Sequence, residues 1–353
     1  MAHDRTTTPV RASAAPRRGE SAVGCENTGF ESARCSALIP LNPNAWRLTT
    51  APMMDWTDRH CRVLFRHLAP NARLYTEMVT TGPLIYGNAE QHRRHLKFTA
   101  VEHPVALQLG GSEREDLALA AKLGADYGYD EINLNCGCPS ERVQRGAFGA
   151  CLMAEPALVA DCVKAMIDAV PAQVPVTVKH RIGLDYSESY DFVRDFVGTV
   201  AAAGCQVFIV HARNAVLKGL SPKENREVPP LRYDVVTRLR TDFPSLVFVL
   251  NGGLTTAQQC VDLLGDSAAA DLRLMDHQLT GSGSPANPLA RGAARVPHGV
   301  MLGRAAYHDS YMLAHTEHAL FGTPLPSREQ IVGRMIEYTA GEIAATRGQQ
   351  FHT

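Results

Sequence analysis

The chain has 353 residues, and 45% of them are hydrophobic, which suits one large globular domain with appendages or two ordinary domains. Its formal net charge is −1, so any nucleic-acid binding must come from a local basic face and not from a polycationic chain. The sequence contains no apolar run of about 18 residues, and we therefore expect no membrane-spanning helix.

Nine cysteines are scattered along the chain, and Cys136 and Cys138 form the one close pair. An odd count without the spacing of a small disulfide-rich domain argues against a secreted scaffold, and the lack of a C-x-x-C pair argues against structural zinc. We expect a reducing compartment, the cytoplasm. Four cysteines in apolar stretches are interpreted as small buried hydrophobic residues, namely Cys61, Cys162, Cys205 and Cys260.

Residues 1–45 differ in composition from the rest of the chain. They are rich in Arg, Ser, Thr, Ala and Pro, and they show neither apolar periodicity nor the apolar core of a secretory signal. We predict a disordered N-terminal extension. An organellar transit peptide stays open as an alternative, although Glu20 and Glu26 argue against it.

From residue 46 to residue 322, short apolar runs alternate with stretches that have helical periodicity. The runs lie at 48–55, 74–79, 104–111, 131–139, 175–183, 207–214, 247–253 and 298–308. Eight β-then-α units of this total length predict an α/β fold, a (β/α)8 TIM barrel. The rival is an open doubly wound sheet, but no G-x-G-x-x-G follows the first strand.

Two segments depart from this rhythm. Residues 265–297 are rich in Gly, Ser, Ala and Pro, and we predict a loop insertion between the seventh helix and the eighth strand. Residues 323–353 contain one more helical stretch and then the chain stops. We expect a short C-terminal helical segment after the barrel.

Polar residues follow the predicted strands at their carboxyl ends, while the strands themselves read as apolar. In a (β/α)8 barrel the functional residues gather on this face, and the candidates are Asp55, Glu77, Gln108, Asn135, Cys138, Lys179, Arg181, His211, Arg213, Asn251 and Arg304. Such a ring of polar strand ends predicts one shared site.

Glycines and an arginine follow the last two strands, where barrels commonly bind phosphate. Gly252-Gly253 lets backbone N–H groups approach phosphate oxygens, and Gly303-Arg304 adds a charged fork. Two ordinary turns are the alternative interpretation. Gln108, Lys179 and His211 are then placed to contact an aromatic ring system, where the lysine would stabilise an anionic reduced flavin.

Cys138 lies in a Gly-Cys-Pro turn after the fourth strand. A thiol at a barrel mouth near Lys, Arg and His can serve as an acid or a nucleophile. Cys136 is expected to point elsewhere and is interpreted as the inert one of the two. A purely structural cysteine pair and a two-cysteine metal site stay open as alternatives, although C-x-C alone is a weak signal for a metal.

Motifs on all eight predicted strands resemble, in order, those of the tRNA-dihydrouridine synthases, most of all the bacterial A-type subgroup, which acts on uridines 20 and 20a of the tRNA D-loop. The motifs are APMMDWTDRHCR, LYTEMVTTGPLI, HPVALQLGGS, YDEINLNCGCPSERVQRGAFGACLM, PVTVKHRIG, FIVHARNAVLKGLSPKENREVPPL, NGG and GVMLGRAAY. The resemblance covers roughly residues 47–322.

The resemblance implies bound FMN, with NADPH or NADH as the reductant, and tRNA as the macromolecular partner. It assigns FMN binding to Pro52, Met53, Met54, Gln108, Lys179, His211, Asn251, Gly252, Gly253, Gly303 and Arg304. Cys138 matches the catalytic cysteine. Contacts to tRNA are implied for Asn135, Arg213, Lys223, Asn225 and Arg226. No obligate protein partner is inferred.

The implied reaction is reduction of the uridine C5=C6 bond, with hydride from flavin N5 to C6 and a proton from Cys138 to C5. Lys179 or Arg181 would stabilise charge on the uracil carbonyls. Two departures from the family pattern are the short segment 323–353, in place of a helical tRNA-binding domain, and the insertion at 265–297. The competing interpretations are another FMN barrel acting on a small molecule, of dihydroorotate dehydrogenase or ene-reductase type, and a truncated, non-catalytic RNA-binding form.

Overall fold

The computed structural model of the protein describes residues 41–187, 189–265 and 296–347. The predictions for residues 1–40 and for 266–295 of the insertion therefore lie outside the described residues.

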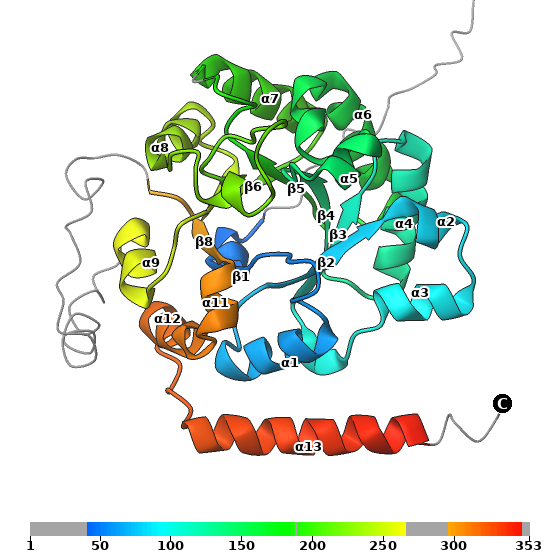
Figure 1. Ribbon diagram of the computed structural model, residues 1–353, viewed down its shortest axis with the longest axis vertical. Helices are drawn as coiled ribbons and strands as arrows, with labels where there is room; N and C mark the ends of the chain where they lie inside the picture. The colour runs from blue at the N-terminus through cyan, green and yellow to red at the C-terminus, as the bar shows by residue number, and fades with distance from the viewer. Residues whose placement is uncertain (1–40, 188, 266–295, 348–353) are drawn as a thin grey trace, which may run out of the picture. The chain divides into compact units, whose positions relative to one another are not determined.

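Eight parallel strands form one sheet in the order β1-β8-β7-β6-β5-β4-β3-β2. Their bounds are β1 Leu48–Thr50, β2 Leu74–Thr80, β3 Val105–Gly110, β4 Glu131–Cys136, β5 Val176–Arg181, β6 Val207–His211, β7 Val247–Asn251 and β8 Gly299–Leu302. The ring closes between β1 and β2, where the Thr50 amide donates to the Arg73 carbonyl at 3.0 Å. The predicted (β/α)8 barrel is confirmed, with helices around the strands (Figure 1).

Several of the helices between the strands begin at residues whose side chains accept hydrogen bonds from the first free amides. Asp58 accepts a hydrogen bond from the Cys61 amide at 2.8 Å at the start of α1, and Thr256 forms a capping box with Gln259 at α9. The main helices are α1 Arg59–Leu68, α2 Thr81–Ile85, α3 Ala89–Leu96, α4 Arg114–Asp126, α5 Glu141–Arg145, α6 Pro156–Ala169, α7 Tyr190–Ala202, α8 Tyr233–Asp242, α9 Ala257–Leu264, α11 Arg304–His308, α12 Tyr311–Phe321 and α13 Arg328–Arg347.

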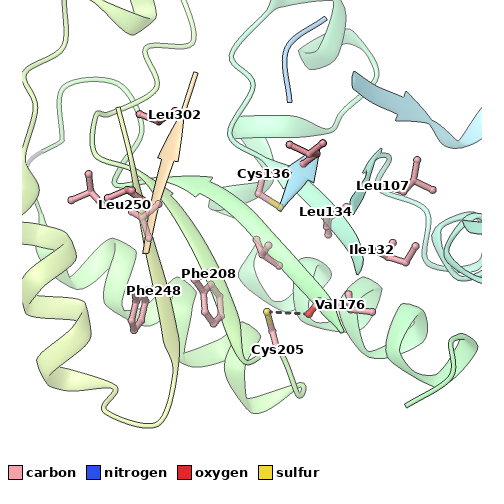
Figure 2. Close-up of a cluster of buried hydrophobic side chains, with 14 of the residues drawn as sticks. Leu107, Ile132, Leu134, Cys136, Val176, Cys205, Phe208, Phe248, Leu250 and Leu302 are labelled. Carbon is pink, nitrogen blue, oxygen red and sulfur yellow. Dashed lines mark hydrogen bonds between the residues drawn. The ribbon is translucent and has the colours of Figure 1, made fainter. Parts of the chain in front are cut away.

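Apolar side chains on both faces of the strands explain the apolar runs in the sequence. One set fills the layer between strands and helices, as Figure 2 shows for Leu107, Leu134, Phe208 and Leu250, all fully buried. Alternate residues of the same strands form a second cluster, which includes Val207, Ile209, Val247, Val249 and Met301. Because successive strand residues point to opposite faces, this second cluster occupies the inside of the barrel.

The inside of the barrel is not apolar throughout, which corrects the prediction that the strands are apolar up to their ends. Glu131 and Asn133 of β4 and Thr177 of β5 are fully buried and alternate with the outward-facing Ile132 and Leu134. The half of the barrel built from β3 to β5 therefore has a polar interior, and the half built from β6 to β8 an apolar one.

Glu131 is held at the base of the barrel by donors from several elements. Its carboxylate accepts hydrogen bonds from Trp46 Nε1 at 2.8 Å and from the Tyr75 hydroxyl at 2.6 Å, and it lies 3.4 Å from the Arg73 guanidinium. Trp46 ends the 3₁₀ helix η1, Pro43–Trp46, and is 2% exposed. The predicted boundary at residue 46 is therefore too late, since residues 43–45 already belong to the folded unit.

We expect Glu131→Gln to lower the free energy of unfolding by about 2–3 kcal/mol, because an amide nitrogen would face the buried donors Trp46 Nε1 and Arg73. Urea denaturation followed by tryptophan fluorescence measures this. An unchanged midpoint would show that the buried carboxylate adds nothing to stability.

After the barrel, α13 contacts α1. Glu342 pairs with Arg59 at 2.5 Å, and the Tyr338 hydroxyl lies 2.8 Å from His60 Nδ1. The predicted C-terminal helical stretch is thus a 20-residue helix bound to the barrel wall. No helix in the described part of the chain is long and apolar enough to cross a membrane.

Candidate functional site at the carboxyl ends of the strands

The strand register brings the polar strand ends together. Asn135 of β4 is the neighbour of Lys179 on β5, and His211 of β6 pairs with Arg181 on one side and Asn251 on the other. All the strands are parallel, so these side chains lie at one end of the barrel. The ring of strand ends expected from the sequence is present.

Lys179 is the half-buried cation of this ring. Its Nζ donates to Asn251 Oδ1 at 3.1 Å, and Asn251 Nδ2 in turn donates to the Met301 carbonyl at 2.8 Å. Burial, aided by the charge of Arg181, lowers the pKa of Lys179 to about 7. An anionic group brought beside this ammonium would favour its charged form.

At the end of β7, the backbone lies close to the side chains of the mouth. Gly252 and Gly253 have φ values of +112° and +71°, which side chains rarely adopt, and a Cβ on Gly252 would lie 2.8 Å from His211 Cδ2. Burial and the nearby cations, Arg181 first, hold the pKa of His211 well below its ordinary value. The imidazole is therefore neutral at physiological pH.

Cys138 follows β4 on the same face. Its amide and that of Gly137 donate to Asn135 Oδ1 at 3.0 and 3.1 Å, and its half-buried Sγ lies 3.6 Å from Ser140 Oγ. Cys136, by contrast, is fully buried in the layer between strands and helices, and burial raises the pKa of its thiol (Figure 2). Cys136 is the last residue of β4 and Cys138 lies in the turn after it, so the two thiols have different surroundings.

Arg181 is 3% exposed, and its Nε and Nη1 atoms donate to backbone carbonyls. It donates to the carbonyls of Gly137, Asn214 and Asn225 at 3.1, 3.2 and 2.9 Å. Arg181 thus ties the Cys138 turn to the loop after β6. Its expected contact with a uracil carbonyl stays a prediction.

The first strand continues into a tight turn at the mouth. Met53 packs against the interior cluster and its amide donates to Thr57 Oγ1 at 2.9 Å, whereas Met54 is 55% exposed. Pro52 is half-buried beside them. The Asp55 amide donates to Glu77 Oε1 at 2.5 Å. These residues therefore present an apolar edge at the rim of the mouth.

The loop after β6 carries the basic residues assigned to tRNA, and they differ in exposure. Lys223 and Arg226 are exposed, and Arg213 is half-buried and donates to the Glu227 and Pro229 carbonyls. Asn225 is fully buried, with its amide bonded to the backbone of Val216. The expected tRNA contact by Asn225 is therefore corrected, because its side chain holds the loop from inside.

Beside β8, Gly303 leaves open space, since a Cβ there would lie 3.7 Å from its nearest neighbour, Ala51. Arg304 is half-buried and pairs with Glu227 of the basic loop at 2.7 Å. The arginine is thus shared between the phosphate site expected from the sequence and the loop after β6.

A hollow lined by the first turns of α4 and α6 and by η3 (Gly149–Ala154) has a volume of about 600 Å³. Its lining includes Glu113, Glu155 and Asp161, and Arg114 there is paired with Glu115 at 2.6 Å. An acidic lining repels phosphate groups. The barrel mouth remains the candidate site.

Sequence reasoning missed the polar residues inside the barrel. Asn133 bonds to Gln108 and Thr177, and Gln108 bonds to Asn135, so the mouth is supported by amides from below. The signal was present in the alternation of E-I-N-L-N at 131–135, where every second residue is polar. A half-buried strand with one face toward solvent has the same alternation. The sequence pattern therefore does not distinguish a polar barrel interior from a solvent-exposed face.

The donor set of the mouth fits a flavin mononucleotide. Gln108, Asn251, His211 and Lys179 supply amide, imidazole and ammonium groups from four strands, and the backbone at Gly252 has a positive φ that side chains rarely adopt. A planar ring with a polar edge and a phosphate uses groups of these kinds. The mouth of this (β/α)8 barrel combines a thiol, a cation and a set of amides. The fold and the site together therefore define the protein as a (β/α)8-barrel enzyme.

The family model for dihydrouridine synthases (Dus) matches residues 49–274. A tRNA-dihydrouridine(20/20a) synthase of Pseudomonas syringae pv. tomato is 53% identical over 301 residues, which cover 85% of this chain and 79% of that protein. Proteins of the same name from Pseudomonas aeruginosa and Vibrio vulnificus are 51% and 48% identical over 83% and 84% of this chain, and over 78% and 81% of their own lengths. The chain belongs to the dihydrouridine synthase family.

Proposed function

We propose that this protein is an FMN-dependent tRNA-dihydrouridine synthase that reduces the uridine C5=C6 bond at positions 20 and 20a of the tRNA D-loop. The observation that carries the proposal is the presence of Cys138, Lys179 and Asn251 on one barrel mouth, in a chain about half identical to synthases of that name. The uridine positions follow the names of the relatives.

Gln108, Lys179, His211 and Asn251 would hold the flavin ring, with Pro52, Met53 and Met54 along its edge. The phosphate end belongs to the turns after β7 and β8, with Gly252, Gly253, Gly303 and Arg304. Bound FMN, reduced by NADPH or NADH, supplies the hydride. The protein supplies the cation of Lys179, which balances negative charge near the ring.

Cys138 supplies the proton. Its turn is held by Asn135, so the thiol has a defined place at the mouth, and it donates the proton to uracil C5 as charge develops there. The base is unreachable while it is stacked in the tRNA fold and must be held extruded. Exposed Lys223 and Arg226 face the phosphate backbone of the tRNA, with Arg213 and Arg304 behind them.

The proposal is tested by mixing the FMN-loaded, NADPH-reduced protein with unmodified tRNA under exclusion of oxygen and following the flavin absorbance. We expect tRNA to reoxidise the flavin, and orotate and simple enones to leave it reduced. Reoxidation by orotate or an enone but not by tRNA would favour a barrel oxidoreductase for small molecules. A flavin that tRNA binds but does not reoxidise would favour a non-catalytic RNA-binding form. The cytoplasm is the expected compartment, and no obligate protein partner is part of the proposal.

A further inference from the structure

A line of buried hydrogen bonds begins at the base of the barrel. The Thr177 hydroxyl donates to Glu131 Oε1 at 2.5 Å, and Asn133 Nδ2 donates to Thr177 Oγ1 at 2.7 Å. All three residues are fully buried. They come from β4 and β5 and occupy the polar half of the barrel interior.

The same line continues to the mouth. Gln108 Nε2 donates to Asn133 Oδ1 at 2.7 Å, and Asn135 Nδ2 donates to Gln108 Oε1 at 2.8 Å. Asn135 Oδ1 then accepts the amides of Gly137 and Cys138. We call the residues Glu131, Thr177, Asn133, Gln108 and Asn135 the polar column.

The direction of every bond in the polar column follows from its lower end. The Glu131 carboxylate meets only donors, from Trp46, Tyr75, Thr177 and the nearby Arg73, and a carboxylate in that setting accepts. Thr177 must then donate downward and accept from the amide above it. Each side-chain amide in turn has one orientation, with its NH2 group toward the base and its oxygen toward the mouth.

We propose that Glu131 is a positioning residue for the reaction at the mouth, acting through the polar column on Asn135 and the Cys138 turn. An amide free to flip would present NH2 to the amides of Gly137 and Cys138 and would release the turn. The column also fixes which group Gln108 can offer to the flavin. The inference rests on the proposed function, because it concerns the same thiol and the same cofactor.

The test compares two variants, each of which lacks one of the two hydroxyl groups that donate to Glu131 Oε1. Thr177→Val breaks the polar column, whereas Tyr75→Phe removes a hydrogen bond to Glu131 Oε1 and leaves every link of the column in place. Both hydroxyls are fully buried, so both variants should lose a similar free energy of unfolding. Thr177→Ser keeps the hydroxyl and serves as the rescue variant. Thr177→Ala is a second variant that breaks the polar column, and it places no methyl group where the hydroxyl was.

Two quantities are measured in each FMN-loaded variant. The first is the rate at which iodoacetamide alkylates Cys138 across a pH series, quantified on the Cys138 peptide by mass spectrometry. The second is the single-turnover rate of dihydrouridine formation on unmodified tRNA at saturating tRNA. We expect Thr177→Val to slow turnover about tenfold, as a misplaced thiol would, and to shift the pH profile of alkylation.

Tyr75→Phe should keep both quantities within about twofold of the unmodified protein, and Thr177→Ser should restore both. Equal effects of Thr177→Val and Tyr75→Phe, or no recovery in Thr177→Ser, would reduce the column to a structural role and overturn the inference. If the proposed function is wrong, no variant makes dihydrouridine. The alkylation profiles still test whether the polar column positions Cys138, because that measurement needs no tRNA.

Discussion

Cys138→Ala is expected to lower the rate of dihydrouridine formation by about 10²–10⁴-fold while FMN stays bound, because it removes a general acid. The thiol lies half-buried at the mouth, in a turn whose amides are held by Asn135. The substitution removes the proton donor and leaves these backbone hydrogen bonds in place. Quenched-flow measurement of one turnover by the prereduced protein, together with the flavin absorbance of the purified variant, gives both results.

Cys136→Ala is the matched control, since this cysteine stands two residues earlier and is buried outside the mouth. We expect it to cost some stability through lost packing and to leave turnover within about twofold. Turnover by Cys138→Ala at the rate of the unmodified protein would remove Cys138 from the reaction.

Lys179→Met is expected to weaken FMN binding and to stabilise the flavin-free fold near pH 6 by about 1–2 kcal/mol. Burial lowers the pKa of Lys179 to about 7 from 10.5, so the folded chain holds this proton less tightly than the unfolded chain does. Below pH 7 the folded protein carries the whole cost of the buried charge. Between pH 7 and 10.5 the unfolded chain alone stays protonated, and the stability of the unmodified protein rises with pH.

The stabilising effect of Lys179→Met should therefore shrink between pH 6 and pH 9. Urea denaturation of the flavin-free proteins at the two pH values measures it, and fluorescence titration gives the FMN affinity. Lys164→Met, which removes an exposed lysine paired with Asp168, should show no such pH dependence. An advantage of equal size at both pH values would contradict the assigned cause.

The barrel and the position of its mouth could be predicted because they follow from local patterns. Apolar runs such as 207–211 and 247–251 were readable as strands, and parallel strands bring residues such as His211 and Asn251 to one end. The resemblance to the dihydrouridine synthases agreed with this and was confirmed by the family match.

Burial inside the site could not be predicted in the same way. Asn225 stands between Glu224 and Arg226 in a polar segment and reads as exposed, yet it is fully buried by contacts to Val216. The sequence also suggests that Arg181 is a free cation, but its Nη1 donates to loop carbonyls that are distant in sequence. Such contacts depend on how loops fold back, which no periodicity records.

The most direct test of the central claim is mass spectrometry of unmodified tRNA after incubation with the FMN-loaded protein and NADPH. The account predicts a gain of two hydrogens on uridine at position 20 or 20a, and in D2O a deuterium at C5, because the proton of the Cys138 thiol exchanges with solvent. Unchanged uridine at these positions, under conditions in which NADPH reduces the flavin, would contradict it.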